Sequence, residues 1–537
     1  MTVRFRRPLI ASVLAAAAFA VVGCGTGAGP TGATAAGGAP QPGGTLRFAV
    51  SSDQGCVDPQ QVASTDSIYF ARQIVDSLTD QDPRSGALVP WLATTWQSSP
   101  DAKSYTFTLR ENVTFADGTP LDAEAVKANF DRIPQLGLRA QLPKAYLAGY
   151  AGTTVQSPTR FTVSFAEPNV QFLQGTSTHS LGILSPATVA RSEDDRCTAV
   201  VGSGPFAVRD YVRNSSITLA KRPGYAWASP LSNHQGEAYL DTLDFRIVPE
   251  SGVRTGSLVS GEVDAIGTIG EQDEAPLTDA GAQLLARPNP GLVLGLGLNL
   301  STPVVADPTV REALSLAIDR QEIVDAIYPS QTRPATSVLA STTPSFADES
   351  ALLGFDTGRA KSLLDAAGWV PGPDGIRAKD GARLAVPVSF VSNFSTNKPA
   401  LELVQQQARV VGIDVQLLEV PISTVAAQLQ SGDFVANWAN LTRADPDILR
   451  SSFSTAGVNT YRFPRGPLDA SLTAQASEPD PVKRTAIVRQ AQEIMVREKY
   501  YVPVVELTTV LGVGANVHDV TFDAASRVQL HGAWKSQ

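Results

Sequence analysis

Cysteine and histidine are both scarce in this chain. Only three cysteines and four histidines occur among its 537 residues. No two of the histidines stand at the spacing of metal ligands, so neither a dedicated metal site nor another cofactor is expected. No pair of cysteines has the CxxC spacing of a thiol redox enzyme, which excludes that chemistry. The four histidines are His179, His234, His518 and His531.

Enzyme signatures are also missing. The chain has no Gly-x-Ser-x-Gly elbow and no Walker loop. Ser395 and Lys398 fit the Ser-x-x-Lys pattern of β-lactamases, but neither Ser-Asp-Asn nor Lys-Thr-Gly follows them. Residues 27–32 spell a dinucleotide fingerprint without the preceding strand that such a site needs. We therefore expect a binding protein and not an enzyme.

Long apolar runs are limited to the N-terminus. The run from Leu9 to Val22 follows a positive start that includes Arg6 and Arg7, and it is too short to span a bilayer as a mature helix. Cys24 follows small residues, as in a bacterial lipobox. We predict a signal peptide over 1–23 and lipidation of Cys24, with an ordinary cleaved signal as the alternative. Sec and twin-arginine export both stay open.

Residues 24–43 consist mainly of Gly, Ala, Thr and Pro, without apolar periodicity. They predict a flexible tether that reaches roughly 20–25 Å from the membrane. The body would then lie at the extracytoplasmic face of the bacterial cell membrane. Loss of the signal's three arginines takes the formal net charge from −9 to −12. Nucleic acid is therefore not expected as a partner, and the lipid anchor is the only expected membrane contact.

Cys56 and Cys197 are the two cysteines beyond the lipobox. An even number of cysteines in an oxidising compartment favours a disulfide, which would close a long loop and add a few kcal/mol of stability. Two unrelated free thiols are the alternative.

The sequence of the body that follows the tether predicts an α/β protein. More than 490 residues are too many for one hydrophobic core, so we expect at least two lobes. Polar and apolar residues alternate over 45–50 and 104–109, which predicts half-buried strands. Asp122 and Asp307 each stand where a helix cap is expected, and Gly368 stands where a helix should end. Helical periodicity is stronger in the second half.

Several motifs resemble one family in order and spacing. The most specific runs from Leu109 to Lys127 and combines a strand, a tight turn and a capped helix. Together the motifs resemble the family 5 extracytoplasmic solute-binding proteins, the oligopeptide, dipeptide and nickel-binding components of ABC importers. The others are VGSGPF at 201–206, LVSGEVD at 258–264, VREALSLAIDR at 310–320, AKSLLDAAGW at 360–369, GIDV at 412–415 and DPD at 445–447.

The resemblance implies a two-lobed periplasmic-binding-protein fold of type II, in its large cluster with an extra subdomain. Mixed sheets would be joined by hinge strands, for which we assign Pro290–Leu300 and Val504–Val513. The expected divisions are lobe I over 44–295 with an extra subdomain at about 79–200, lobe II over 296–508, and a C-terminal return to lobe I over 509–537.

The candidate ligand contacts of the second lobe follow from the resemblance. Trp438 could stack on a flat or apolar group, while Asn440 and Arg443 could bind carbonyls or a carboxylate. Peptide-binding relatives place an aspartate a few residues after the tryptophan, where this chain has leucine and threonine. Asp445 could substitute, although an Asp-Pro turn is more often structural.

The first lobe contributes candidates at the end of its first strand. Ser51, Ser52 and Asp53 stand at the expected edge of the cleft, and Tyr69 opens the helix behind it. Turn capping and core packing are the alternatives for each of them.

The resemblance implies a monomeric receptor that captures a peptide-like or similar polar solute between its lobes. The receptor would deliver this solute to an ABC permease with its ATPase subunits. A metal chelate, a glycan or an opine-like compound is the alternative ligand. A sensor or envelope-assembly lipoprotein without a transport role is the alternative of another class.

Overall fold

The computed structural model describes residues 39–137, 139–391, 395–455 and 459–536. The predicted signal peptide, Cys24 and residues 24–38 of the predicted tether lie outside the described residues. The chain divides into two units, Met1–Ala39 and Pro40–Gln537, and all that follows concerns the second. None of the described helices is both long and apolar enough to cross a membrane.

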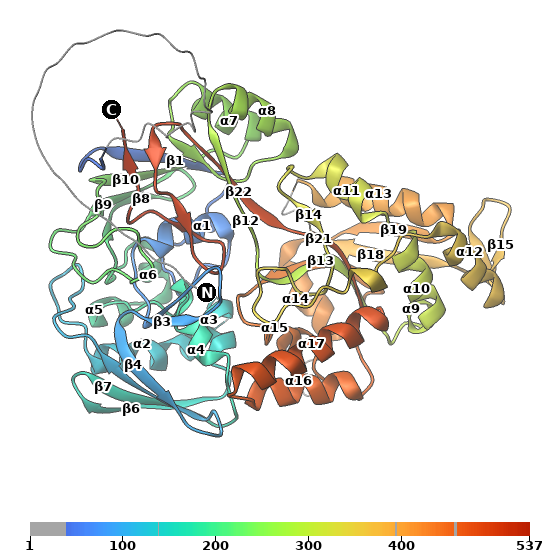
Figure 1. Ribbon diagram of the computed structural model, residues 1–537, viewed down its shortest axis with the longest axis horizontal. Helices are drawn as coiled ribbons and strands as arrows, with labels where there is room; N and C mark the ends of the chain where they lie inside the picture. The colour runs from blue at the N-terminus through green and yellow to red at the C-terminus, as the bar shows by residue number, and fades with distance from the viewer. Residues whose placement is uncertain (1–38, 138, 392–394, 456–458, 537) are drawn as a thin grey trace, which may run out of the picture. The chain divides into compact units, whose positions relative to one another are not determined.

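One sheet of the second unit has seven strands and is mixed. β1 pairs in parallel with β10 and β11, while the outer strands pair in antiparallel (Figure 1). Helices α1 (Thr65–Arg72), α7 (Ser251–Val259) and α8 (Glu271–Asp279) accompany this sheet. In spatial order its strands are β12 (Gln283–Pro288), β22 (Thr508–Val513), β11 (Ala265–Ile266), β1 (Thr45–Val50), β10 (Thr242–Ile247), β9 (Ser216–Lys221) and β8 (Phe206–Val212).

A smaller antiparallel sheet and several short helices are inserted between β1 and β8. In β5 the apolar residues Tyr105, Phe107 and Leu109 are buried, as their alternation predicts. The side chain of Asp122 accepts a bond from the backbone N–H of Ala125 at 2.9 Å, which confirms the predicted helix cap. The strands are β4 (Ala93–Ser98), β5 (Ser104–Leu109), β7 (Arg160–Phe165) and β6 (Tyr150–Ser157), beside the pair β2 (Thr79–Gln81) and β3 (Leu88–Pro90). The helices are α2 (Ala123–Arg132), η1 (Ile133–Leu136), α3 (Gln141–Tyr146), α4 (Phe172–Gly175), η2 (His179–Leu181), α5 (Pro186–Val189) and α6 (Glu193–Thr198).

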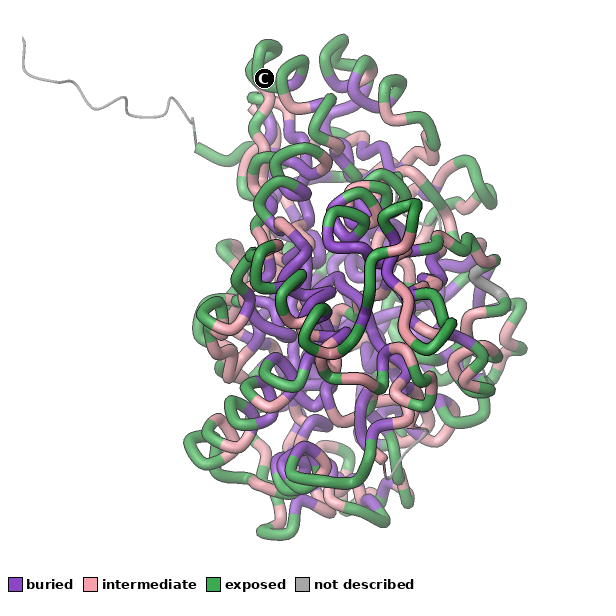
Figure 2. Tube along the Cα trace, turned by 90° about the vertical axis from the view of Figure 1, so that its right-hand side faces the viewer, coloured by how far each residue is buried: buried purple, intermediate pink, exposed green. Residues whose placement is uncertain are grey.

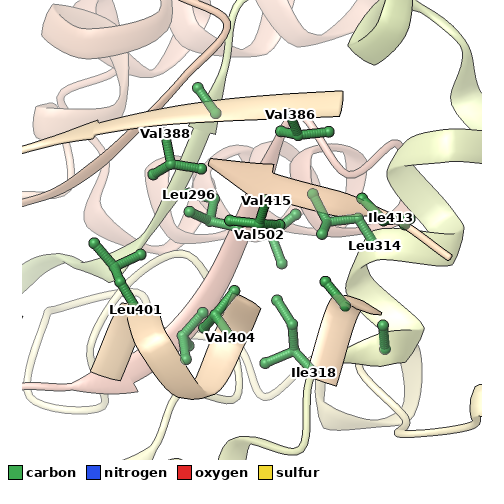
Figure 3. Close-up of a cluster of buried hydrophobic side chains, with 14 of the residues drawn as sticks. Leu296, Leu314, Ile318, Val386, Val388, Leu401, Val404, Ile413, Val415 and Val502 are labelled. Carbon is green, nitrogen blue, oxygen red and sulfur yellow. The ribbon is translucent and has the colours of Figure 1, made fainter. Parts of the chain in front are cut away.

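A second mixed sheet has six strands and a separate core. Figure 3 shows this core, in which side chains of β13, β18, β19 and β21 meet those of helices α10 and α13. Figure 2 shows the buried stretches running through the interior, with exposed turns around them. In spatial order the strands of this six-stranded sheet are β14 (Arg333–Pro334), β21 (Tyr501–Glu506), β13 (Gly291–Leu298), β20 (Ala436–Thr442), β18 (Ala385–Phe390) and β19 (Asp414–Glu419).

Among the helices between the strands of the second sheet, one predicted helix start and one predicted helix end are confirmed. Asp307 caps α10 through a 2.8 Å bond from the backbone N–H of Thr309. Gly368 follows α12 with φ at +83°, a conformation that glycine adopts without steric cost. The helices are α9 (Pro303–Ala306), α10 (Pro308–Ala317), α11 (Arg320–Ile327), η3 (Ser350–Leu352), α12 (Thr357–Ala366), α13 (Asn397–Val410), α14 (Ile422–Ser431), α15 (Ile448–Phe453), α16 (Pro467–Ser477) and α17 (Pro481–Arg497).

Short strands complete this part of the chain. They form a three-stranded sheet between α12 and β18 and two pairs at the C-terminus. The strands are β15 (Val370–Pro371), β16 (Arg377–Lys379), β17 (Ala382–Arg383), β23 (Val517–His518), β24 (Thr521–Phe522), β25 (Val528–Gln529) and β26 (Trp534–Lys535).

The chain passes between the two large sheets at two neighbouring points. β12 leads into β13 through Asn289 and Pro290, and β21 leads into β22 through Leu507. The N–H of Asn289 donates to the Leu507 carbonyl at 2.7 Å, so the two passages are bonded to each other. The first change of sheet precedes most of the predicted Pro290–Leu300 hinge strand, while the second lies within Val504–Val513. The lobe divisions themselves stay predictions.

Cys56 and Cys197 form a disulfide, which confirms that prediction and rejects the alternative of two free thiols. The bridge lies beside an ion pair between Asp58 and Arg196, 2.8 Å apart, whose side chains are both fully buried. Arg196 also donates to the Gln60 side chain at 2.7 Å. The bridge therefore belongs to a buried polar network.

His531, on the C-terminal return to the first sheet, should make stability depend on pH. Its Nε2 contacts the Gly236 carbonyl at 2.8 Å, and burial lowers its pKa to about 4. Because this folded pKa lies below that of the unfolded chain, stability should fall by about 2–3 kcal/mol as the pH falls from 6.5 to 4. Urea unfolding at pH 7 and pH 4.5 should show a smaller loss for His531→Gln than for the unchanged chain. Equal losses would contradict this assignment.

Candidate functional site

A small cavity lies where three distant segments of the chain meet. Its volume is about 30 Å³, room for little more than one or two water molecules. Ligand pockets usually measure roughly 300–1,000 Å³, so a solute requires the walls to move apart. The lining residues are Asp80, Gln81, Leu142, Tyr146, Gln174 and Ser177 to Ser180 from the first segment, Thr442 and Arg443 from the second, and Asp523, Ala524, Ala525 and Arg527 from the third.

Arg443 reaches the cavity from the end of β20. Its Nη1 donates to the Gln171 side chain at 3.3 Å and to the Ser451 hydroxyl at 3.1 Å. Its guanidinium lies over the Tyr146 ring, 5.2 Å from the centroid. Within the described part of the chain, no carboxylate forms an ion pair with this arginine, although only 8% of the residue is exposed. A buried guanidinium held by neutral groups is a ready partner for an anion.

His179 and Gln174 contribute polar atoms that the protein itself leaves unused. The imidazole Nε2 of His179 and the amide oxygen of Gln174 are buried and have no hydrogen-bond partner among the described residues. Burial lowers the pKa of His179 well below its ordinary value, and the nearby Arg527 and Arg72 lower it further. The imidazole is therefore neutral at pH 7. Because unsatisfied buried polar atoms are costly, both atoms favour a polar occupant of the cavity.

The predicted contacts of the second lobe do not gather in one place. Trp438 belongs to the core of the second sheet, and its indole N–H donates to the Asn397 side chain at 3.1 Å. Asn440 is half-buried near the end of β20 and does not line the cavity. Of the eight candidates, only Arg443 lines it. Solute contact by the other seven stays a prediction.

Asp445 is held by Arg484. The two carboxylate oxygens of Asp445 accept bonds from the guanidinium at 2.6 and 2.9 Å. Burial alone would raise the pKa of Asp445, but Arg484, together with the Asp447 N–H and the nearby Arg443, outweighs this effect and keeps the pKa below its ordinary value. Asp445 also accepts from the Asp447 N–H at 2.8 Å, as expected for an Asp-Pro turn.

The first-lobe candidates are engaged in local structure. Ser51 and Ser52 each donate backbone and hydroxyl bonds to one oxygen of Asp66. Asp53 accepts from the Tyr211 hydroxyl at 2.6 Å and from the Asn214 N–H at 2.9 Å. Tyr69 is 2% exposed and packs against Phe48, and burial raises its pKa. Turn capping and packing thus account for their positions.

Apart from Arg443, the lining residues are not among the predicted contacts, and Tyr146, Gln174, His179 and Arg527 are the most relevant of them. His179 does not stand at metal-ligand spacing from another histidine, so spacing gives no signal for it. Arg527 lies in the C-terminal return, whose approach to residues 142–180 depends on the fold of the whole chain. The residue types carried a signal, since arginine and histidine are seldom buried without a partner. Their burial cannot be derived from sequence.

The sequence profile of the bacterial extracellular solute-binding proteins, family 5 Middle, matches residues 87–460. The chain belongs to this family. Its members are extracytoplasmic solute-binding components of ABC importers. The chain is thus a solute-binding protein and not an enzyme, which confirms the predicted family and general function.

Individual relatives agree. The glutathione-binding protein GsiB of Salmonella paratyphi A is 26% identical over 477 residues, covering 85% of this chain and 88% of GsiB. The structure of NikA from Brucella suis in complex with Fe(III)-EDTA has a TM-score of 0.80 and 23% identity, covering 92% of this chain and 100% of NikA.

A peptide complex has the same fold. DppA from Helicobacter pylori in complex with the peptide STSA has a TM-score of 0.73 and 22% identity, covering 93% of this chain and 99% of DppA. These solved structures are two-lobed periplasmic binding proteins, so the predicted two-lobed α/β fold is confirmed.

Proposed function

We propose that this family 5 binding protein captures a small peptide-like solute with at least one carboxylate, in the cavity lined by Arg443. The observation that carries this proposal is the buried guanidinium of Arg443, whose side-chain hydrogen bonds and ring contact among the described residues all involve neutral groups. A solute carboxylate would accept from this guanidinium in place of the Gln171 side chain. His179 and Gln174 would bind further polar atoms of the solute.

Capture requires the walls of the cavity to move apart and then to close on the solute. Arg443 follows a strand of the second sheet, whereas Tyr146 and Gln171 belong to the insertion between β1 and β8. A solute that bonds to both sides stabilises the closed arrangement by its difference in affinity for the two states. The permease of an ABC importer, together with its ATPase subunits, would recognise the closed arrangement and accept the solute.

The location of the protein, its oligomeric state and the division of its lobes are also part of the proposal. Lipidation of Cys24 would hold the protein at the extracytoplasmic face of the cell membrane, and the protein would act as a monomer. The lobes would be divided as predicted, with lobe I over 44–295, lobe II over 296–508 and the return over 509–537. Mass spectrometry of the protein from its native host tests the lipid on Cys24 and identifies any solute that co-purifies.

Arg443→Ala should weaken the binding of a carboxylate-bearing peptide about 30-fold or more, because it removes a buried charged donor. Calorimetric titration with a set of tripeptides measures this effect. The free energy of unfolding of the solute-free protein should change by less than about 2 kcal/mol, since only neutral partners are lost.

Arg450→Ala is the matched control. Arg450 also lies near this end of the second sheet, but it pairs with Asp447 and does not line the cavity. Its removal should leave the peptide affinity unchanged. Equal affinities of Arg443→Ala and the unchanged protein would refute the role of Arg443.

A metal chelate captured whole is the second candidate ligand. The neutral, unpartnered Nε2 of His179 favours it, because such an imidazole nitrogen can take an open position on a bound metal. Titration with a metal chelate beside the peptides distinguishes the two ligands. His179→Gln should reduce binding of the chelate far more than binding of a peptide.

A further inference from the structure

The C-terminal hairpin supplies a second buried arginine to the same cavity. β24 and β25 pair in antiparallel, and the tip between them, Asp523–Arg527, provides four lining residues. The Nη1 of Arg527 donates to the Thr65 hydroxyl at 2.7 Å. No ion pair joins Arg527 to any described residue, although only 6% of the residue is exposed. The hairpin thus places an unpaired cation in the wall.

The tip is held in a fixed position. The carboxylate of Asp523 accepts bonds from the backbone N–H groups of Ala525 and Arg527, both at 2.9 Å. The Ser526 hydroxyl donates to the Pro288 carbonyl at 2.7 Å, at the end of β12 where the chain leaves the first sheet. Behind the tip, the Gln73 side chain bonds to the backbone of Val528 and Leu530. Arg527 is therefore presented by a braced turn and not by a loose end.

The two arginines reach the cavity from different parts of the fold, and Tyr146 lines the same cavity. The Arg443 guanidinium lies 5.2 Å from the centroid of the Tyr146 ring, and burial raises the pKa of the Tyr146 hydroxyl to about 12, a rise that Arg443 and Arg527 oppose. Burial lowers the pKa of Arg527 itself, and Tyr69 and Asp523 only partly offset this effect. Neither guanidinium forms an ion pair with a described residue, whereas a buried charge normally has a paired counter-ion.

Resting on the proposed function, we propose that the solute carries two carboxylates, one bound by Arg443 and the other by Arg527. The two aspartates that line the cavity do not cancel the preference for a solute with two carboxylates, because both have other partners. Asp523 pairs with Arg72 at 3.9 Å and with its own backbone, and Asp80 accepts from the Ser229 hydroxyl. The neutral amide and imidazole of the wall fit the polar middle of such a solute.

The test compares tripeptides that differ in one carboxylate, on the full chain. Glu-Ala-Gly has a side-chain and a C-terminal carboxylate, and Gln-Ala-Gly has only the C-terminal one. The unchanged protein should bind the former about 30-fold more tightly, as expected for one buried charge-assisted contact. Arg527→Met should remove this preference, and Arg527→Lys should restore part of it. Arg443→Met should weaken the binding of both peptides.

A buried arginine outside the cavity provides the control for folding. Arg254 bonds to the carbonyls of Val248, Pro249 and Thr268. Arg254→Met should lower the melting temperature but keep the preference for the dicarboxylate. Equal binding of the two peptides by the unchanged protein would overturn the second carboxylate alone. Binding of neither peptide would contradict the proposed function, and with it this inference.

Discussion

Removing the Cys56–Cys197 bridge by changing both cysteines to serine should lower the free energy of unfolding by about 3–5 kcal/mol. The bridge joins residues 141 positions apart, so its loss frees a long loop in the unfolded chain. Equilibrium unfolding in urea, followed by circular dichroism and tryptophan fluorescence, measures the change. Dithiothreitol should destabilise the unchanged protein by a similar amount and leave the double variant unaffected.

The bridge should also matter for the cavity. Arg196, next to Cys197, donates to Gln60, and Gln60 donates to the Gly182 carbonyl at 3.0 Å. Gly182 directly follows η2, whose first residue is His179. Loss of the bridge should therefore loosen the wall that carries His179 and weaken solute binding. An unchanged urea midpoint in the double variant would show that the ion pair of Asp58 and Arg196 holds the loop without the bridge.

Local features of the fold were predictable because they depend on near neighbours. The alternation in β5, the caps Asp122 and Asp307, and the positive φ of Gly368 each follow from a few consecutive residues. The family followed from several such motifs in order. The pairing of Cys56 with Cys197 needed only an even number of cysteines and an oxidising compartment.

The candidate site was harder to predict because burial is decided by distant segments. The motif predicts solute contact for Trp438, but only the fold shows that Asn397 in α13 accepts from its indole and that the side chain belongs to a core. Ser52 was expected at an edge of the cleft, but Asp66 accepts its bonds. Arg527 becomes a lining residue only because β22 returns the chain to the first sheet.

Buried charges separate structural from binding roles in this protein. Asp58 with Arg196 and Asp445 with Arg484 form buried pairs in which each charge has its counter-ion. The two lining arginines form no such pair within the described residues. A paired charge is already neutralised, whereas an arginine that lines the cavity without a counter-ion can still bind a solute anion. Outside the cavity, an arginine without a counter-ion, such as Arg254, is held by backbone carbonyls. This distinction assigns Asp445 to the scaffold and Arg443 to the solute.

Arg484→Met should cost about 3–5 kcal/mol of stability, because Asp445 would stay buried without a cation. Arg484 also donates to the Gln475 side chain at 3.0 Å, so one hydrogen bond between α16 and α17 is lost as well. Urea unfolding at pH 7 measures the loss. The double variant Asp445→Asn, Arg484→Met should lose less stability than Arg484→Met alone, since it contains no unpaired buried charge at this place.

The dependence on pH distinguishes a charge effect from a packing effect. In the unchanged protein Asp445 has a pKa below its ordinary value, so the pair stabilises the fold above about pH 4, and this contribution disappears as the pH falls through the folded pKa. In Arg484→Met burial raises the pKa of Asp445, and the destabilisation caused by this carboxylate should be greatest at neutral pH. The difference between the two proteins should thus shrink below about pH 4. A difference that is the same at pH 7 and pH 3.5 would mean that Arg484 acts through packing and hydrogen bonds alone.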